Sequence, residues 1–175
     1  MDLRVEKTIK SIFNTFLEMR AKKPLEKISV TELSNKAMIN KATFYLHFKD
    51  IYDLSDCLES ELVNSIIDKI APEEFVSDPV TAIDTLTEAY AAKKNMIQIL
   101  FADTRSQRLA QKVEEGVKEL LFERNPEWKE DCGKNTLISY VVFGSYYAFV
   151  NNDKFSPAET IRSISAISAH LKHLI

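Results

Sequence analysis

The chain has 175 residues, of which 45% are hydrophobic, only three are glycine and five are proline. This composition favours an all-helical protein, and the length allows one domain or a small module joined to a larger one. A net charge of −3 argues against an unspecific DNA coat, and no apolar run approaches the roughly 18 residues of a membrane span.

The charge is distributed unevenly along the chain. Residues 1–50 hold ten Lys and Arg against six Asp and Glu, a net charge of +4, whereas residues 51–175 hold thirteen against twenty, a net charge of −7. A basic module on an acidic body is the pattern expected when only the first part faces phosphates. We therefore expect a specific, oriented binder of an anionic partner.

The first predicted helix covers residues 3–20 and ends before Pro24. Its apolar stripe consists of Val5, Ile9, Ile12, Phe13, Phe16 and Leu17. This helix is expected to cover the apolar backs of the next two helices. A module of about fifty residues buries little surface alone, so it should pack against later parts of the chain.

Two short helices are predicted within Ser29–Lys49. Ser29 and Glu32 have the spacing of a capping box, and Asn40 is a good N-cap for the second helix. About three residues, Met38 to Asn40, separate the two helices. This arrangement is typical of a helix-turn-helix.

The outer face of the second helix has an unusual composition. Phe44 and Phe48 share the face expected to be buried, and the residues from Asn40 to Lys49 include no Asp or Glu. Small, aromatic, hydroxyl and basic side chains suit phosphates, base edges and thymine methyl groups. The alternative is that Tyr45 and Leu46 are buried against other parts of the protein.

The run TELSNKAMINKATFYLHFKDIYDL resembles the DNA-binding region of the TetR/AcrR family of bacterial transcriptional regulators. The matching core is Thr43-Phe44-Tyr45 followed by Phe48-Lys49, and the resemblance covers about residues 5–62. One departure is Met38, where the family usually has Gly. Met with a positive φ is strained by ~1 kcal/mol or more, so we expect a reshaped turn or a Met38 that serves as an extra core contact.

The resemblance implies a dimeric DNA-binding regulator, most simply a repressor, with one recognition helix (40–48) per subunit in a major groove of a near-palindromic operator. A small-molecule effector in the body would shift the dimer to a form that releases DNA. The residues expected to contact DNA are Ser29, Thr31, Asn40, Lys41, Ala42, Thr43, Tyr45, Leu46, His47 and Lys49.

The body is predicted to be helical throughout, so that the chain is all-α with about nine helices. Residues 1–50 form the DNA-binding domain, and residues 51–175 form the domain for effector binding and dimerisation. The body begins with a long connector helix whose stripe is Ile51, Leu54, Leu58, Leu62, Ile66 and Ile70. Further helices are expected after Asp78-Pro79, from Asn95 to Ala102, over 106–124, and, after a loop at 125–134, in two final segments.

The final segments, 136–150 and 157–174, are the expected homodimer interface. The first is apolar nearly all the way round and must be covered on several sides, whereas the second begins with a capping box at Ser156 and Glu159. The alternative is a fully intramolecular core. For the effector, the resemblance points to a mostly apolar pocket among the aromatic residues of the body, and the alternative for each of them is ordinary core packing. These residues are Tyr90, Phe101, Phe122, Tyr140, Phe143 and Tyr147.

Nothing in the sequence indicates an enzyme. Nucleophile motifs and glycine-rich nucleotide loops are absent, and no cofactor is expected. His170 and His173 have a spacing that could hold a metal, but no carboxylate lies near them on that helix, so no metal site is predicted. Cys57 and Cys132 have no metal spacing, and without a signal peptide they are expected to be free thiols of a cytoplasmic protein.

Two other functions remain open. In one, the DNA-binding module is kept but the body binds a protein partner and no small molecule. In the other, the chain is a helical ligand-binding or enzymatic bundle in which the helix-turn-helix only serves packing. The effector, the operator, the target genes and the direction of regulation do not follow from the sequence.

Overall fold

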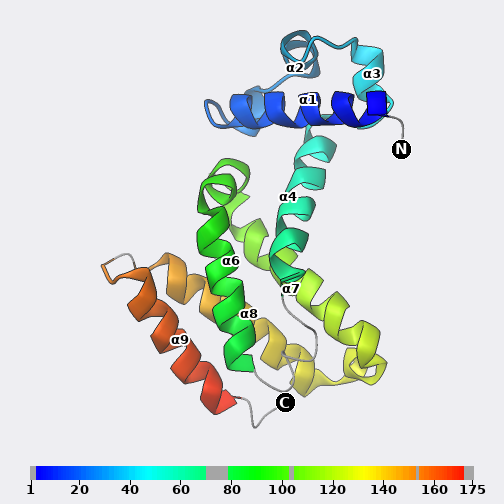
Figure 1. Cartoon of the computed structure of the whole chain (residues 1–175). Coiled ribbons are helices and arrows are strands. Elements are labelled where there is room, and N and C mark those ends of the chain that lie inside the picture. The colour runs from blue at the N-terminus through cyan, green and yellow to red at the C-terminus, as the bar shows by residue number, and fades with distance from the viewer. Residues whose placement is uncertain (1–2, 70–78, 103–104, 153, 172–175) are drawn as a thin grey trace. The chain divides into compact units, whose positions relative to one another are not determined.

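The computed structural model describes residues 3–69, 79–102, 105–152 and 154–171. Within these ranges the chain has eight α-helices, two short 3-10 helices and no strand (Figure 1). The prediction of an all-α fold is therefore confirmed.

The helices form two compact units. The first comprises Met1–Leu62 with Asn95–Ser106, and the second comprises Val63–Lys94 with Gln107–Ile175. The sequence predicts a functional boundary after residue 50, but the first compact unit takes in most of α4 (Ile51–Ile67) and a segment from much later in the chain. The small module thus gains its apolar cover from residues beyond its predicted end.

The core of the first unit is built around α1 (Leu3–Arg20). Its Ile12 and Phe16 are completely buried, as are Leu33 of α2 (Val30–Lys36) and Phe44 of α3 (Lys41–Tyr45). Phe48 lies beside this core, with its ring centroid 6.0 Å from that of Phe13 and 5.6 Å from that of Phe44. A short 3-10 helix, η1 (Leu25–Lys27), connects α1 to α2.

Helix α4 begins after Asp50, whose carboxylate accepts hydrogen bonds of 2.8 Å from the backbone N–H groups of Tyr52 and Asp53. The predicted stripe is buried at Ile51, Leu54, Leu58, Leu62 and Ile66, and Ile70 lies outside the described residues. The same helix also buries a carboxylate that the apolar pattern does not reveal.

That carboxylate is Glu59, which is completely buried. It accepts hydrogen bonds from the Ser55 hydroxyl at 2.8 Å and from Nε of Arg105 at 2.7 Å, and Nη2 of Arg105 lies 2.7 Å from the same carboxylate as an ion pair. Arg20 of α1 also reaches the same late segment, donating to the carbonyl of Ala102 at 3.5 Å. Hydrogen bonds and an ion pair thus connect Ala102 to α1 and Arg105 to α4 within the first unit.

Helix α6 corrects the predicted element order. It runs without a break over Pro79–Leu100, where the sequence predicts one helix followed by a second that begins at Asn95. Asn95 is exposed, and Ile97 and Leu100 continue the buried face at helical spacing, so nothing forces a break. The predicted cap Asp78 and the side chains of Val80 and Ile83 lie outside the described residues.

Helix α7 (Ser106–Arg124) leads through the 3-10 helix η3 (Pro126–Glu130) into α8 (Cys132–Val150). The predicted loop over 125–134 is thus shorter, because Asp131 caps α8 through the N–H of Lys134 at 3.0 Å. The side-chain amide of Asn135 then donates to the carbonyls of Trp128 and Asp131, both at 2.9 Å. These bonds hold the reversal of the chain between α7 and α8.

The last helix, α9, covers Pro157–Leu171. The predicted capping box is present: the N–H of Ser156 donates to Glu159 at 3.0 Å, and the N–H of Glu159 donates to the Ser156 hydroxyl at 3.3 Å. The end of the predicted helix, including Leu174, lies outside the described residues. Among the residues that are described, no helix is long and apolar enough to cross a membrane.

Candidate nucleic-acid interface and effector cavity

The local sequence fixes the geometry of α2 and α3. The Ser29 side chain accepts from the N–H of Glu32 at 3.2 Å, and that of Asn40 accepts from the N–H of Ala42 at 2.9 Å. The predicted box at α2 is completed differently, because the Glu32 carboxylate forms an ion pair with Lys23. Both helices therefore begin at their predicted caps.

The turn between the two helices keeps a conformation that usually requires glycine. Met38 has a φ of 55°, and the N–H of Ile39 donates to the carbonyl of Ser34 at 3.0 Å. The bond pattern is a Schellman motif with Met38 at its left-handed position. The Met38 side chain is 93% exposed, so the turn is neither reshaped nor stabilised by a Met38 core contact.

Helix α3 is shorter than the predicted 40–48. It ends at Tyr45, and a tight turn follows in which the N–H groups of His47 and Phe48 both donate to the carbonyl of Phe44 at 3.0 Å. This turn keeps Phe48 on the buried side. The ring of Tyr45 stands edge-on to that of Phe44, and the two ring centroids are 5.5 Å apart. This contact with a buried ring fixes the orientation of the Tyr45 side chain.

The outward face of α3 carries large apolar groups in solvent. Leu46 is 79% exposed and Tyr45 is 57% exposed, so neither is packed inside the chain as the alternative interpretation requires. Thr43 and His47 are half-buried. The other predicted contacts are all exposed, namely Ser29, Thr31, Asn40, Lys41, Ala42 and Lys49. Contact of these residues with DNA remains a prediction.

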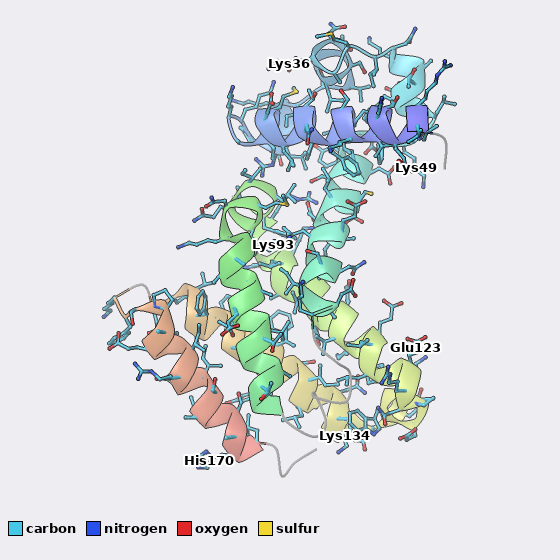
Figure 2. The ribbon with its side chains drawn as sticks, viewed as in Figure 1. Lys36, Lys49, Lys93, Glu123, Lys134 and His170 are labelled. Atoms are coloured by element: carbon cyan, nitrogen blue, oxygen red, sulfur yellow. The ribbon has the colours of Figure 1, made fainter. Side chains whose placement is uncertain are left out.

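Further residues near this face escaped sequence analysis. Tyr52, in the first turn of α4, is 51% exposed, and Lys36 is exposed at the end of α2. Figure 2 shows Lys36 on α2 and Lys49 just before α4. The only sequence signal for Tyr52 was its position one residue after the buried Ile51, which turns it away from the core.

No family model matches the chain, and no curated protein matches it.

The second unit exposes apolar side chains on α8 and α9. Tyr140 is 64% exposed and Tyr147, two turns later on the same face, is 41% exposed. Between them, Gly144 is exposed with open space around the position of a Cβ atom. Ile167 of α9 is 61% exposed. The described part of the chain therefore leaves these positions of the two predicted interface helices exposed.

The second unit also contains a cavity of about 130 Å³. It lies among α6, α7 and α8, with one residue from α4, one from η3 and two from α9. Its described lining is mostly aliphatic and aromatic. The polar members are Thr87, Tyr90, Lys134, Ser145, Tyr146 and Ser168.

The predicted pocket aromatics do not describe this cavity. Of the six, only Tyr90 lines it. Phe101 is buried in the first unit, Tyr140 and Tyr147 are exposed, and Phe122 and Phe143 are half-buried away from the lining. The aromatic residues that do line it with Tyr90 are Trp128, Tyr146 and Phe149.

Both tyrosines of the described cavity lining are neutral hydrogen-bonding groups. Burial raises the pKa of Tyr90. The pKa of Tyr146 is also raised, mainly by burial and to a smaller extent by the neighbouring hydroxyl groups of Tyr90 and Tyr147. Both phenols therefore keep their protons at neutral pH. Tyr90 also packs edge-on against Phe149, with ring centroids 5.2 Å apart.

The described residues contain no group of three or more His, Cys, Asp and Glu arranged for a metal ion. Of the two histidines considered for a metal, His170 directs its Nδ1 to the carbonyl of Ala166 at 2.8 Å, and His173 lies outside the described residues. Cys57 and Cys132 are both free thiols.

Proposed function

We propose that this chain is a TetR-like transcriptional regulator. It binds a near-palindromic operator as a homodimer and releases it when a small molecule occupies the cavity of the second unit. The observation that carries this proposal is the outer face of α3, where Tyr45 and Leu46 lie in solvent on a helix anchored by the buried Phe44. Exposed apolar groups clustered on one rigid face mark an interaction site.

The chemistry of that face suits the major groove. The proposed phosphate contacts are Lys41, Tyr45, His47 and Lys49, together with Ser29 and Thr31 at the start of α2. Ala42, Thr43 and Leu46 are the proposed readers of base edges and thymine methyl groups. Two-fold symmetry would set the two recognition helices about 34 Å apart or somewhat more.

The DNA proposal is tested by selecting and sequencing genomic fragments that the protein retains, followed by anisotropy titrations on the best fragment. We expect Tyr45→Ala and Lys49→Ala to weaken binding, and Lys49→Ala to lower the slope of log affinity against log salt by about one. Lys129→Ala removes the same charge from an exposed site on η3 and serves as the control. If both α3-face variants bind as tightly as the parent, the interface is misassigned.

The uncovered apolar positions of α8 and α9 support the homodimer. A subunit of 20.0 kDa should sediment as a species of twice that mass at micromolar concentration. Ile167→Glu places a charge on the exposed patch and should yield the monomer, whereas Gln111→Glu, an equal change at an exposed site on α7, should not. A parent protein that sediments at 20.0 kDa would refute the dimer.

Release by an effector is supported by how the chain connects the two units. Helix α4 carries Glu59 of the buried ion pair and also Ile66 of the cavity lining. Arg105, the other partner, directly precedes α7, which lines the cavity from Leu109 onward. A ligand that binds one arrangement of these helices more tightly than another shifts the population of the DNA-binding form.

If the body bound a protein partner and no small molecule, its interior would not need a cavity. The cavity therefore favours a small molecule. Titration of the operator complex with candidate ligands separates the two, because a protein-dependent regulator would keep its DNA at every ligand concentration.

A further inference from the structure

The cavity of the second unit has room for one small ring. Its volume is about 130 Å³, and an apolar cavity of about 150 Å³ in another protein holds a benzene molecule. An occupant of this size has about six to eight non-hydrogen atoms. Long acyl chains, fused ring systems and nucleotide-sized molecules are therefore too large for it.

Aromatic side chains form one part of the lining. Tyr90 of α6 packs edge-on against Phe149 of α8, with ring centroids 5.2 Å apart. Tyr146 also lines the cavity and lies three residues before Phe149, which places the two on the same face of α8. A ring that meets other rings edge-on or offset gains more than the burial of its area alone. This wall therefore favours an aromatic occupant over an aliphatic one of the same volume.

The lining also offers hydroxyl groups that have no other role in the fold. Among the described residues, the side-chain hydroxyls of Tyr90 and Ser168 have no hydrogen-bond partner. Burial raises the pKa of Tyr90, so its phenol stays protonated at neutral pH and can both donate and accept. Pockets for small molecules combine a mostly apolar wall with a few such polar groups, which orient the ligand. An occupant with one hydrogen-bonding group would find a partner here.

The charge of the lining does not favour an ionised occupant. Lys134 is the one charged residue among those described as lining the cavity. Its ammonium lies 5.0 Å from the ring centroid of Trp128 and takes part in a further interaction within the chain. Moving an ionised group from water to an apolar wall costs far more than moving a neutral one. The occupant is therefore expected to be uncharged.

We infer that the cavity binds a simple phenol, a neutral molecule with a single aromatic ring and one hydroxyl group. The ring lies against Tyr90, Tyr146 and Phe149, and the ligand hydroxyl forms a hydrogen bond with that of Tyr90. This inference rests on the proposed function in taking the cavity as the effector site, but ligand binding is measured without DNA.

The test is calorimetric titration of the 175-residue chain with p-cresol, which is the tyrosine side chain as a free molecule and is uncharged at neutral pH. Binding should saturate at one molecule per subunit, with a dissociation constant on the order of 0.1 mM for so small a ligand. Benzoate is an anion of nearly the same size. It should bind at least about tenfold more weakly than p-cresol.

Titration with 4-butylphenol distinguishes a cavity of limited size from unspecific apolar binding. In an unrestricted apolar site each added methylene strengthens binding about fourfold, so the longer alkyl group would strengthen it about sixtyfold. A cavity of about 130 Å³ has no room for that group, so 4-butylphenol should bind more weakly than p-cresol. Tighter binding of 4-butylphenol would overturn the inference.

Two variants separate the hydrogen bond from general packing. Tyr90→Phe removes the hydroxyl and keeps the ring, so it should weaken p-cresol about fivefold and leave toluene, which has no hydroxyl, unchanged. Ala110→Leu fills part of the buried lining and should abolish binding of both ligands. Ala92→Leu is the same change at an exposed site on α6 and should bind both as the parent does. Far-ultraviolet circular dichroism checks that each variant is folded.

The inference is also overturned if p-cresol does not saturate, if benzoate binds as tightly as p-cresol, or if Tyr90→Phe weakens p-cresol and toluene equally or weakens neither. These failures would leave retention of genomic DNA untouched. Conversely, a protein that binds p-cresol but retains no DNA fragment would refute the proposed regulator and not the ligand class.

Discussion

Replacing Arg105 with methionine tests whether the late segment of the first unit is held by a buried charge pair. Arg105→Met keeps most of the side-chain volume but removes the 2.7 Å hydrogen bond from Nε to Glu59 and the 2.7 Å ion-pair contact from Nη2 to the same carboxylate. Glu59 is completely buried, and Ser55 donates to the same oxygen at 2.8 Å. The variant therefore leaves a carboxylate in the core without its guanidinium.

The expected loss of unfolding free energy is large. Breaking a buried pair by removing one partner costs about 3–5 kcal/mol, a substantial part of the 5–15 kcal/mol that stabilises a typical domain. Replacing both partners by apolar residues is often neutral. The double variant Glu59→Leu with Arg105→Met should therefore regain most of the stability that the single variant loses.

Urea unfolding followed by far-ultraviolet circular dichroism measures these differences through the midpoint at constant slope. Lys118→Met is the matched control because it breaks a 2.7 Å pair with Glu114 in which both side chains are partly exposed. That loss should be about 1 kcal/mol or less. If Arg105→Met costs no more than the control, or if the double variant is no more stable than the single, the pair does not hold the segment.

Two further variants test local features. Met38→Gly should raise the free energy of unfolding by about 0.5–1 kcal/mol in the same urea assay, because glycine adopts the φ of 55° without strain, whereas Met38→Ala should not. Bonds from Ser156 lower the pKa of Glu159, so their stabilisation is present above the ordinary Glu pKa of about 4.3 and disappears as pH falls through the folded value. The melting temperatures of Glu159→Gln and the parent should therefore converge in acid, and a constant difference would contradict this.

Features encoded by neighbouring residues were predictable from the sequence. The caps at Ser29, Asn40 and Ser156 lie within three residues of the N–H groups that they bond, so the sequence alone specifies them. The stripe of α4 was equally predictable, because a helix with one apolar face has only one way to bury it. The solvent exposure of the DNA-binding candidates followed from placing Phe44 and Phe48 inside.

Interactions between distant residues were not predictable. Glu59 and Arg105 are 46 residues apart, and a glutamate between leucines on a helix is normally solvated. Asn95 raised the opposite difficulty. It is a good cap by residue type, but its neighbours continue the buried face of α6, and tertiary packing overrides such a local preference.

The residues that line the cavity could not be predicted from residue type. Helix α8 is apolar nearly all the way round, so its sequence has no period that reveals the face toward the interior. Tyr146 and Tyr147 are neighbours of one type, yet one lines the cavity and the other is 41% exposed, because successive residues on a helix diverge by about 100°. The cavity exists where side chains stop short of meeting, as at Ser145 and Ser168, and that depends on the packing of helices far apart in sequence.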